Sequence, residues 1–174
     1  MTPLFPPIMQ LGYVVRNLND ALDHWVRVLG IGPFFVANSV PYGEITYRGR
    51  GIEIETRVAI AYHGTVQIEV IEQTGGDVSM FTDFLGRRGG GLHHVCAVTD
   101  DLAALTLRLS GRGVGVLQGG RTKAGIPFAY FDTDPDDRGR VLEVVQPTPG
   151  LTRFFDKLET AARGWDGTDP IRSL

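Results

Sequence analysis

Short apolar runs, separated by turns rich in glycine and polar residues, dominate the hydrophobic pattern of this chain. Runs of this length are typical of strands that are buried on one or both faces. Two amphipathic stretches with helical spacing interrupt them, at about 21–30 and 102–109. Each follows a polar segment suited to helix capping and ends close to a glycine. The strands are predicted at about 8–12, 34–38, 51–62, 65–73, 92–96, 115–119, 127–132 and 140–146.

The order of these elements repeats. Each half of the chain reads as one strand, one helix and three strands. Gln10 and His94 occupy matching places 84 positions apart, whereas Glu69 and Glu143 match at 74 positions. The second half is therefore about ten residues shorter between its helix and its last strand. The pattern predicts an α+β fold in which two βαβββ modules form a curved, half-open mixed β-barrel with helices outside.

The modules are expected at about 8–73 and 92–147, within a single domain of residues 1–147. The linker, 74–91, contains a short helix and a run of glycines. Residues 148–174 are expected to form a C-terminal helix and tail. One face of that helix is apolar, which favours packing on the barrel exterior or against a dimer partner, with a lid over the site as the alternative. The apolar stripe consists of Leu151, Phe154, Phe155 and Leu158.

Composition restricts the function classes. The 174 residues carry a net charge of −3, which argues against nucleic acid as a partner. No apolar run is long enough to span a bilayer, and the N-terminus does not resemble a signal peptide. The single cysteine, Cys96, excludes an internal disulfide framework and fits a reducing compartment. A cytoplasmic protein without a membrane partner is expected.

Four strands each carry one potential metal-binding side chain: Gln10, Glu69, His94 and Glu143. Glu143 is the most informative, because its neighbours are all apolar and a lone buried carboxylate is costly unless it is paired or binds a cation. Other interpretations remain open. His94 could be a core histidine, Gln10 could hydrogen-bond across a strand, and Glu69 could pair with an arginine while Gln67 takes its place.

The sequence contains other histidines, a pair of arginines and several aromatic residues whose surroundings can be predicted. His93 has the opposite parity to His94 and is expected to face the helix layer or solvent. His24 and His63 are expected to be structural or solvated. Arg87 and Arg88 could contact a phosphate-bearing substrate or belong to a solvated loop. Aromatic residues of the predicted strands and loops are expected mostly in the core, and any that line a cavity would indicate a larger, more apolar substrate. They are Phe34, Phe35, Tyr42, Tyr47, Phe128 and Tyr130.

The repeated βαβββ module, with a candidate ligand on the first and last strand of each copy, resembles the vicinal oxygen chelate superfamily. This superfamily includes glyoxalases, bleomycin-resistance proteins and extradiol dioxygenases. The resemblance covers about 8–147. The linker that runs into Leu92-His93-His94-Val95 is most similar to methylmalonyl-CoA epimerases. The order Gln10, Glu69, His94, Glu143 instead resembles the ligand set of glyoxalase I.

The resemblance implies that these four residues bind one divalent metal ion, namely zinc, nickel, cobalt, manganese or magnesium. It implies a lyase, isomerase or epimerase that removes a proton α to a carbonyl and stabilises an enolate on the metal. Glu143 would be the base and Glu69 its partner on the opposite side. The expected substrate is a small carbonyl compound, either apolar or a CoA thioester, and a homodimer is expected.

Two alternatives remain. One is a metal-free, bleomycin-resistance-type protein that binds a small molecule. The other is an iron-dependent ring-cleaving dioxygenase, which is less suited because such iron sites use two histidines and one carboxylate.

Overall fold

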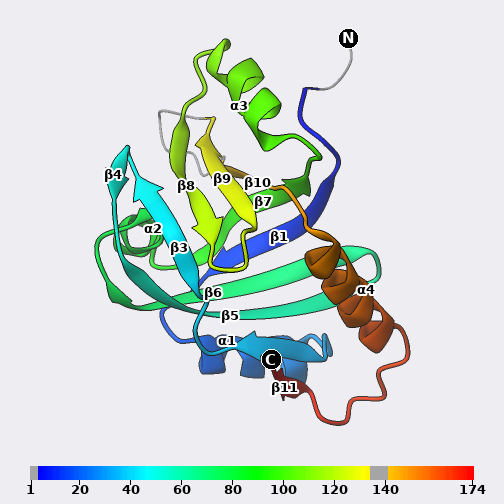
Figure 1. The fold of residues 1–174 in the computed structure, drawn as a ribbon. Helices are drawn as coiled ribbons and strands as arrows, with labels where there is room; N and C mark the ends of the chain where they lie inside the picture. The colour runs from blue at the N-terminus through cyan, green and yellow to red at the C-terminus, as the bar shows by residue number, and fades with distance from the viewer. Residues whose placement is uncertain (1–3, 134–140) are drawn as a thin grey trace.

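A computed structural model describes residues 4–133 and 141–174 of the chain. The described strands form one mixed sheet in the order β11-β2-β5-β6-β1-β7-β10-β9-β8-β3-β4. Figure 1 shows that the sheet curves strongly without closing into a barrel, which confirms the predicted α+β, half-open architecture. The strands are β1 (Ile8–Val14), β2 (Phe34–Ala37), β3 (Tyr42–Tyr47), β4 (Arg50–Gly51), β5 (Ile54–His63), β6 (Val66–Gly76), β7 (Gly91–Val98), β8 (Val116–Thr122), β9 (Pro127–Asp132), β10 (Val141–Val145) and β11 (Ile171–Ser173).

The two halves of the chain are joined at the middle of the sheet, where β1 and β7 pair antiparallel. Within each half the first and last strands pair parallel, β1 with β6 and β7 with β10. The registers match: Gly12, two residues after Gln10, pairs with Glu69, and Cys96, two residues after His94, pairs with Glu143. The internal repeat read from the sequence is therefore present in the strand pairing.

Two helices cover the outer face of the sheet, one from each half. They are α1 (Leu18–Asp23), which continues as the π-helical segment η1 (His24–Val28), and α3 (Leu102–Ser110). Asn17 and Asp101 cap their first turns through side-chain oxygens. Helix α1 buries Leu18 and Leu22 against β2, β5 and β6, and α3 buries Leu105 and Leu109 against β9 and β10.

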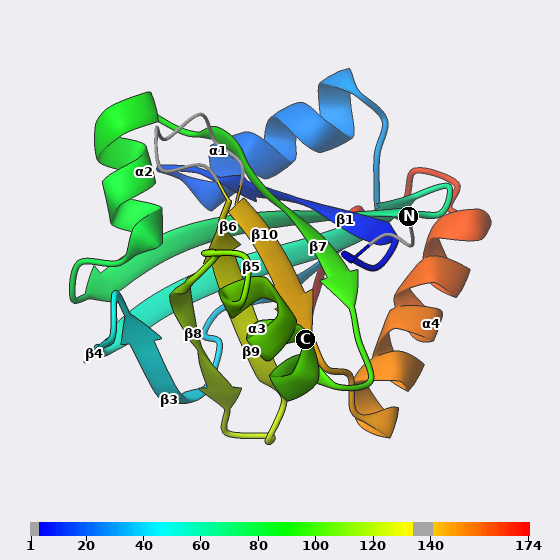
Figure 2. The same cartoon turned by 90° about the horizontal axis from the view of Figure 1, so that it is seen from above.

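The remaining helices lie at opposite ends of the concave face, as Figures 1 and 2 show. Helix α2 (Met80–Arg88) forms the predicted linker helix, and Ser79 caps it. Its Phe81 and Phe84 pack with inward-facing aromatic residues such as Tyr130. Helix α4 (Pro149–Arg163) packs its Leu158 against Phe35 and Tyr62.

Two additions widen the sheet beyond the predicted modules. The hairpin β3–β4 comes from the first half but pairs with β8 of the second half. Residues 42–51 account for the extra length of the first half. At the other edge, β11 pairs parallel with β2. Neither addition follows from the repeat pattern.

In the described part of the chain, no helix combines the length and the apolar character needed to cross a membrane.

Candidate metal centre

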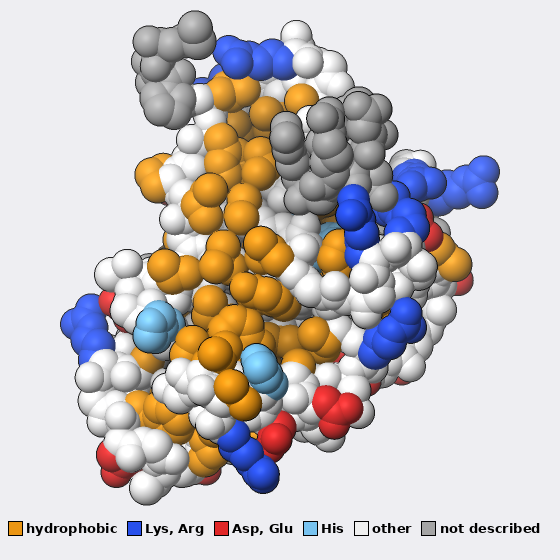
Figure 3. Space-filling view, turned by 180° about the vertical axis from the view of Figure 1, so that it is seen from behind, with side chains coloured by type: hydrophobic (Ala, Val, Ile, Leu, Met, Phe, Trp, Pro, Cys, Tyr) orange, Lys and Arg blue, Asp and Glu red, His pale blue; other side chains and the backbone are white. Residues whose placement is uncertain are grey.

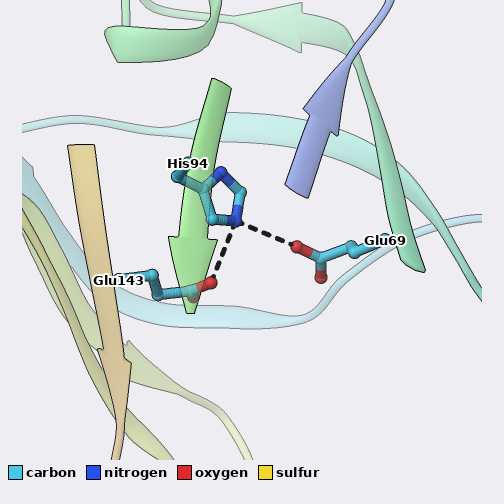
Figure 4. A group of neighbouring side chains, drawn as sticks. All are labelled: Glu69, His94 and Glu143. Atoms are coloured by element: carbon cyan, nitrogen blue, oxygen red, sulfur yellow. Dashed lines mark ion pairs between the residues drawn. The ribbon is translucent and has the colours of Figure 1, made fainter. Parts of the chain in front are cut away.

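The four central strands of the sheet bring the candidate donors to its concave side. Glu69 on β6, His94 on β7 and Glu143 on β10 place one ligand atom each within 4.8 Å of one another. His94 Nε2 lies 3.1 Å from Glu143 Oε2 and 3.4 Å from Glu69 Oε2. Figure 4 shows the two carboxylates approaching the same ring nitrogen of His94 from different directions. Three of the four predicted residues therefore form one cluster.

The donor atoms of this cluster are buried but poorly satisfied. The side chain of His94 has no exposed surface, and those of Glu69 and Glu143 are 14% and 9% exposed. Although the atoms lie within ion-pair distance, His94 Nε2 and Glu69 Oε2 form no hydrogen bond of acceptable geometry within the described residues. Buried polar atoms without partners are costly, and a cation between them would satisfy both.

A glycine makes room for the imidazole. Gly12 lies opposite His94 in the β1–β7 pair, and a Cβ atom at this position would lie 2.0 Å from His94 Cε1 and Nε2. The ring therefore rests on the bare backbone of β1. This close approach explains why a glycine follows Gln10 two positions later in the first strand.

Gln10 lies on the same concave wall, and its amide is held by neighbouring side chains. It is 4% exposed, and its Nε2 donates to Oε1 of Gln67, which is fully buried. Gln67 Nε2 in turn donates to the hydroxyl of Tyr62 at 2.9 Å. Gln10 Oε1 is buried and has no hydrogen-bond partner within the described residues. The free atom of this amide is thus the oxygen, the atom that binds metal.

The alternation of side chains along a strand does not by itself predict the position of His93. Gly12 pairs with His94 and Tyr13 with Leu92, so His93 is the extra residue of a β-bulge. Its buried ring packs against Phe81 and Phe84 of α2, beside His94, and not on the opposite face of the strand, as its parity had predicted. Its Nδ1 lies 3.0 Å from Nδ1 of His94.

The pKa values of the two histidines are shifted in opposite directions. Burial, together with the nearby charges of His94 and Arg87, lowers the pKa of His93 to about 3. Neutral His93 can therefore accept a hydrogen bond from Nδ1–H of His94, so that a metal would bind at Nε2 of His94 in place of the proton that Glu143 and Glu69 favour there. Burial also lowers the pKa of His94, but the carboxylates of Glu143 and Glu69 outweigh it and raise that pKa to about 9. Burial raises the pKa of Glu69, and the nearby charge of Glu143 adds to this effect.

A cavity of about 300 Å³ opens beside the cluster, a volume at the lower end for small-molecule sites. Tyr42, Phe128 and Tyr130 line it, whereas Phe34, Phe35 and Tyr47 do not. The cavity therefore has the apolar character that aromatic lining was expected to indicate. Its lining also includes Gln10, Glu69, Glu143, Leu151, Phe154, Phe155 and Leu174.

The predicted C-terminal helix does more than pack on the exterior. Leu151, Phe154 and Phe155 face this cavity, and Leu158 is buried in the same chain. The stripe is therefore covered intramolecularly and is not the exposed surface on which dimerisation was expected. The position agrees with the alternative of a cover over the site.

The remaining candidates lie elsewhere. Arg87 belongs to α2, where its Nε donates to the carbonyl of Asp83, and neither Arg87 nor Arg88 lines the cavity. His24 and His63 are exposed, as expected for solvated residues.

The residues present fit a divalent metal. Two carboxylates, one imidazole and one amide oxygen form a mixed donor set suited to octahedral first-row metals or magnesium. Three buried atoms without hydrogen-bond partners, Gln10 Oε1, Glu69 Oε2 and His94 Nε2, belong to these four residues. Sequence reasoning did not find the supporting roles of Gln67, Tyr62 and His93, because only tertiary contacts reveal them.

Comparison with known proteins agrees with this geometry. The family model for the glyoxalase/bleomycin resistance protein/dioxygenase superfamily matches residues 9–130. No functionally curated protein matches the sequence.

Solved structures share the fold at low identity. Methylmalonyl-CoA epimerase from Mycobacterium tuberculosis is 22% identical, with a TM-score of 0.59, covering 88% of this chain and 95% of the other. A hypothetical protein from Bacillus halodurans C-125 is 19% identical, with a TM-score of 0.57, covering 82% and 94%. The epimerase from Streptomyces coelicolor, in complex with 2-nitronate-propionyl-CoA, is 18% identical, with a TM-score of 0.54, covering 83% and 96%.

Proposed function

Because the chain belongs to the glyoxalase/bleomycin resistance protein/dioxygenase superfamily, we propose that it is a metal-dependent lyase, isomerase or epimerase that removes a proton α to a carbonyl group. The observation that carries the proposal is the convergence of Glu69, His94 and Glu143 within 4.8 Å beside a cavity. Perturbed, buried titratable groups in a cleft are characteristic of catalytic sites.

Gln10, Glu69, His94 and Glu143 would hold the metal. When bound, a divalent ion supplies Lewis acidity to the carbonyl oxygen of the substrate. Gln67 fixes the amide of Gln10 so that its oxygen faces the site. His93 accepts from Nδ1–H of His94 and so fixes the imidazole tautomer and its direction.

Glu143 is the general base of the proposed reaction. Its carboxylate lines the cavity, so it can reach a proton on a carbon held there. Glu69 approaches His94 Nε2 from a different direction and also lines the cavity. Two carboxylates on opposite sides of a substrate allow epimerisation, whereas a single carboxylate that moves the proton between two carbons gives isomerisation.

The donor set favours this reaction class over ring cleavage by iron. The cluster contains two carboxylates and one histidine, the reverse of the two-histidine, one-carboxylate set of non-haem iron oxygenases. The apolar cavity also suits a protein that only sequesters a small molecule. Metal uptake separates that alternative from the proposed enzyme.

The test combines metal analysis with solvent exchange. Protein purified without a histidine tag is expected to bind about one divalent ion per chain. In D₂O, the loaded protein should exchange the α-proton of at least one carbonyl compound from a panel of 4-methyl-2-oxopentanoate, phenylpyruvate and methylmalonyl-CoA. Glu143→Gln should keep the fold and some metal but lose the exchange, because an amide ligates but cannot take up the proton.

Glu44→Gln, which removes an exposed carboxylate of β3, serves as the matched control and should exchange at the unchanged rate. Exchange by Glu143→Gln at the wild-type rate would remove Glu143 as the base. Absence of metal uptake under saturating zinc, nickel, cobalt, manganese and magnesium would overturn the enzyme proposal in favour of sequestration.

A homodimer is part of the proposal. Apolar side chains gather in a band on the face seen in Figure 3, and the paired β1 and β7 strands expose Ile8 and Leu92 at 57% and 50%. Large exposed apolar areas often mark association surfaces. Light scattering is expected to give twice the mass of one chain, and Leu92→Asp should reduce the measured mass to that of a single chain. A wild-type monomer at high micromolar concentration would contradict the dimer.

A cytoplasmic place of action is also proposed. Cys96, the one cysteine of the chain, is a buried free thiol, so the fold does not depend on an oxidising compartment.

A further inference from the structure

The cavity beside the donor cluster has two chemically different ends. Gln10, Glu69 and Glu143 supply its polar wall, whereas most other lining residues are aliphatic or aromatic. The apolar wall comes from both halves of the sheet, for example Val58 and Phe128. A molecule that fills the space must therefore carry its oxygen atoms at one end and hydrocarbon over most of its remaining surface.

The charges of the lining residues restrict the ligand further. Glu69 and Glu143 carry the only charged side chains among the described lining residues, which include no lysine or arginine. Arg121 is close in sequence to the lining residues Thr122 and Ala124, but it lines a separate pocket and donates to the carbonyl of Gly125 at 2.8 Å. A phosphate in the apolar part of the cavity would find no lysine or arginine among the described lining residues to offset its loss of hydration.

The outer part of the wall is contributed by the C-terminal segment. Leu151, Phe154 and Phe155 of α4 line the cavity, and so does Leu174. The end of this segment is fixed by backbone pairing: β11 pairs with β2, and the amide of Leu174 donates to the carbonyl of Val36 at 3.0 Å. These residues lie outside the matched family region of 9–130.

We propose, resting on the proposed function, that the substrate is an α-oxygenated carbonyl compound with an uncharged aromatic or branched hydrocarbon body, and that α4 and Leu174 complete the wall that selects this body. The oxygenated end faces the donor cluster and the hydrocarbon end contacts Leu151, Phe154 and Phe155. CoA thioesters are excluded from the cavity itself, since their pantetheine and phosphates are polar and find no matching groups there.

Binding of model compounds to the metal-loaded, full-length chain tests the proposal by isothermal titration calorimetry. Pyruvate, 4-methyl-2-oxopentanoate and phenylpyruvate share the vicinal oxygens and differ in the apolar body. Affinity is expected to rise in that order, by about 10- to 100-fold from pyruvate to phenylpyruvate, as burial of one aromatic ring provides. Acetyl-CoA is expected to bind more weakly than phenylpyruvate.

Variants of α4 locate the effect. Phe155→Ala should reduce phenylpyruvate binding by about tenfold and leave pyruvate binding unchanged. Leu151→Ala should give the same signature, so that misfolding of one variant does not remove the test. Lys157→Ala, on the exposed face of the same helix, is the matched control and should bind both compounds as the wild type does.

Equal affinity for pyruvate and phenylpyruvate would overturn the apolar class. So would tighter binding of acetyl-CoA that is lost in Arg121→Ala, because it would place the ligand across the neighbouring pocket. Toluene has no oxygen atom with which to bind a metal, so its binding measures the contribution of the apolar wall alone. Toluene binding to a chain that takes up no metal would overturn the proposed function alone. Metal uptake and pyruvate binding without any gain for phenylpyruvate would overturn the apolar class alone.

Discussion

Gly12 on β1 and His94 on β7 are opposite each other, and the imidazole occupies the space in which any side chain at position 12 would lie. The glycine belongs to the first half of the chain and the histidine to the second. The direction of the central ligand is therefore set by a residue of the other module.

Gly12→Ala is expected to displace the imidazole and lower metal affinity by at least about tenfold, as disturbed ligand orientation does in other metal sites. Titration calorimetry with zinc or cobalt measures the change. Gly51→Ala on β4, where nothing lies within 4 Å of the added Cβ, is the matched control. If Gly12→Ala kept both the wild-type circular dichroism spectrum and the wild-type metal affinity, His94 would not be a ligand.

His93→Phe is expected to keep the packing on Phe81 and Phe84 but to remove the acceptor for Nδ1–H of His94. Metal affinity should fall about 10- to 100-fold, the usual effect of losing such a partner. His63→Phe, at an exposed position at the end of β5, should leave the affinity unchanged. An unchanged affinity in His93→Phe would show that the tautomer of His94 is fixed in another way.

Gln67→Leu should weaken metal binding through Gln10, because the amide of Gln10 loses the partner that turns its oxygen to the site. In a Gln10→Ala background the same change should have no further effect on affinity. A double-mutant cycle measures this coupling, and two fully additive losses would mean that Gln67 acts on the site independently.

His94→Ala is expected to weaken metal binding more than Gln10→Ala, because a neutral amide oxygen is the poorer donor. Competition with a chelator of known affinity ranks the two variants. The reverse order would indicate that the metal is bound mainly through oxygen.

Metal binding should also raise thermal stability. A free metal concentration of about one hundred times Kd adds roughly 2.7 kcal/mol to the free energy of unfolding, and EDTA should reverse the effect. For a chain of this length, each added kcal/mol raises Tm by about 2–4 °C. The shift should vanish in His94→Ala, and a shift that persists there would place the metal elsewhere.

Gly86→Ala provides a test of the fold that does not involve the site. Gly86 is exposed within α2, and nothing lies within 4 Å of an added Cβ. Alanine is expected to raise the free energy of unfolding by about 0.8–1.0 kcal/mol. Chemical denaturation measures the change, and a loss of stability would mean that the backbone at this position is strained.

The repeat and its strands could be predicted because buried strands leave a local apolar signature. The parallel pairing of β1 with β6 and of β7 with β10, which the structure adds, places Glu69, His94 and Glu143 together. The β3–β4 hairpin was not predicted from the sequence. Strand β3 has only two buried residues, Ile45 and Tyr47, and the turn after it is formed by Arg48 and Gly49, both with positive φ. An arginine at such a turn is not a common hairpin signal.

The position of His93 could not be predicted from the alternation of side chains, because the bulge opposite Gly12 and Tyr13 shifts the side chains by one residue.

The role of α4 as a cover over the cavity was undecided for a different reason. An amphipathic stripe shows that Phe154 and Phe155 are covered by something, but not whether a core, a partner or a ligand cavity covers them.

The pairing of β1 with β7 also has a mechanical consequence. Gln10 and Glu69 come from one half of the chain, and His94 and Glu143 from the other, so an ion held by all four acts as a cross-link over that seam. Backbone amides between β1 and β7 should therefore exchange with deuterium more slowly when metal is present, whereas amides at the β11 and β4 edges should not respond. Neither half alone contains all four donors, and loss of the ion would loosen the molecule first along the seam where the two modules of the chain meet.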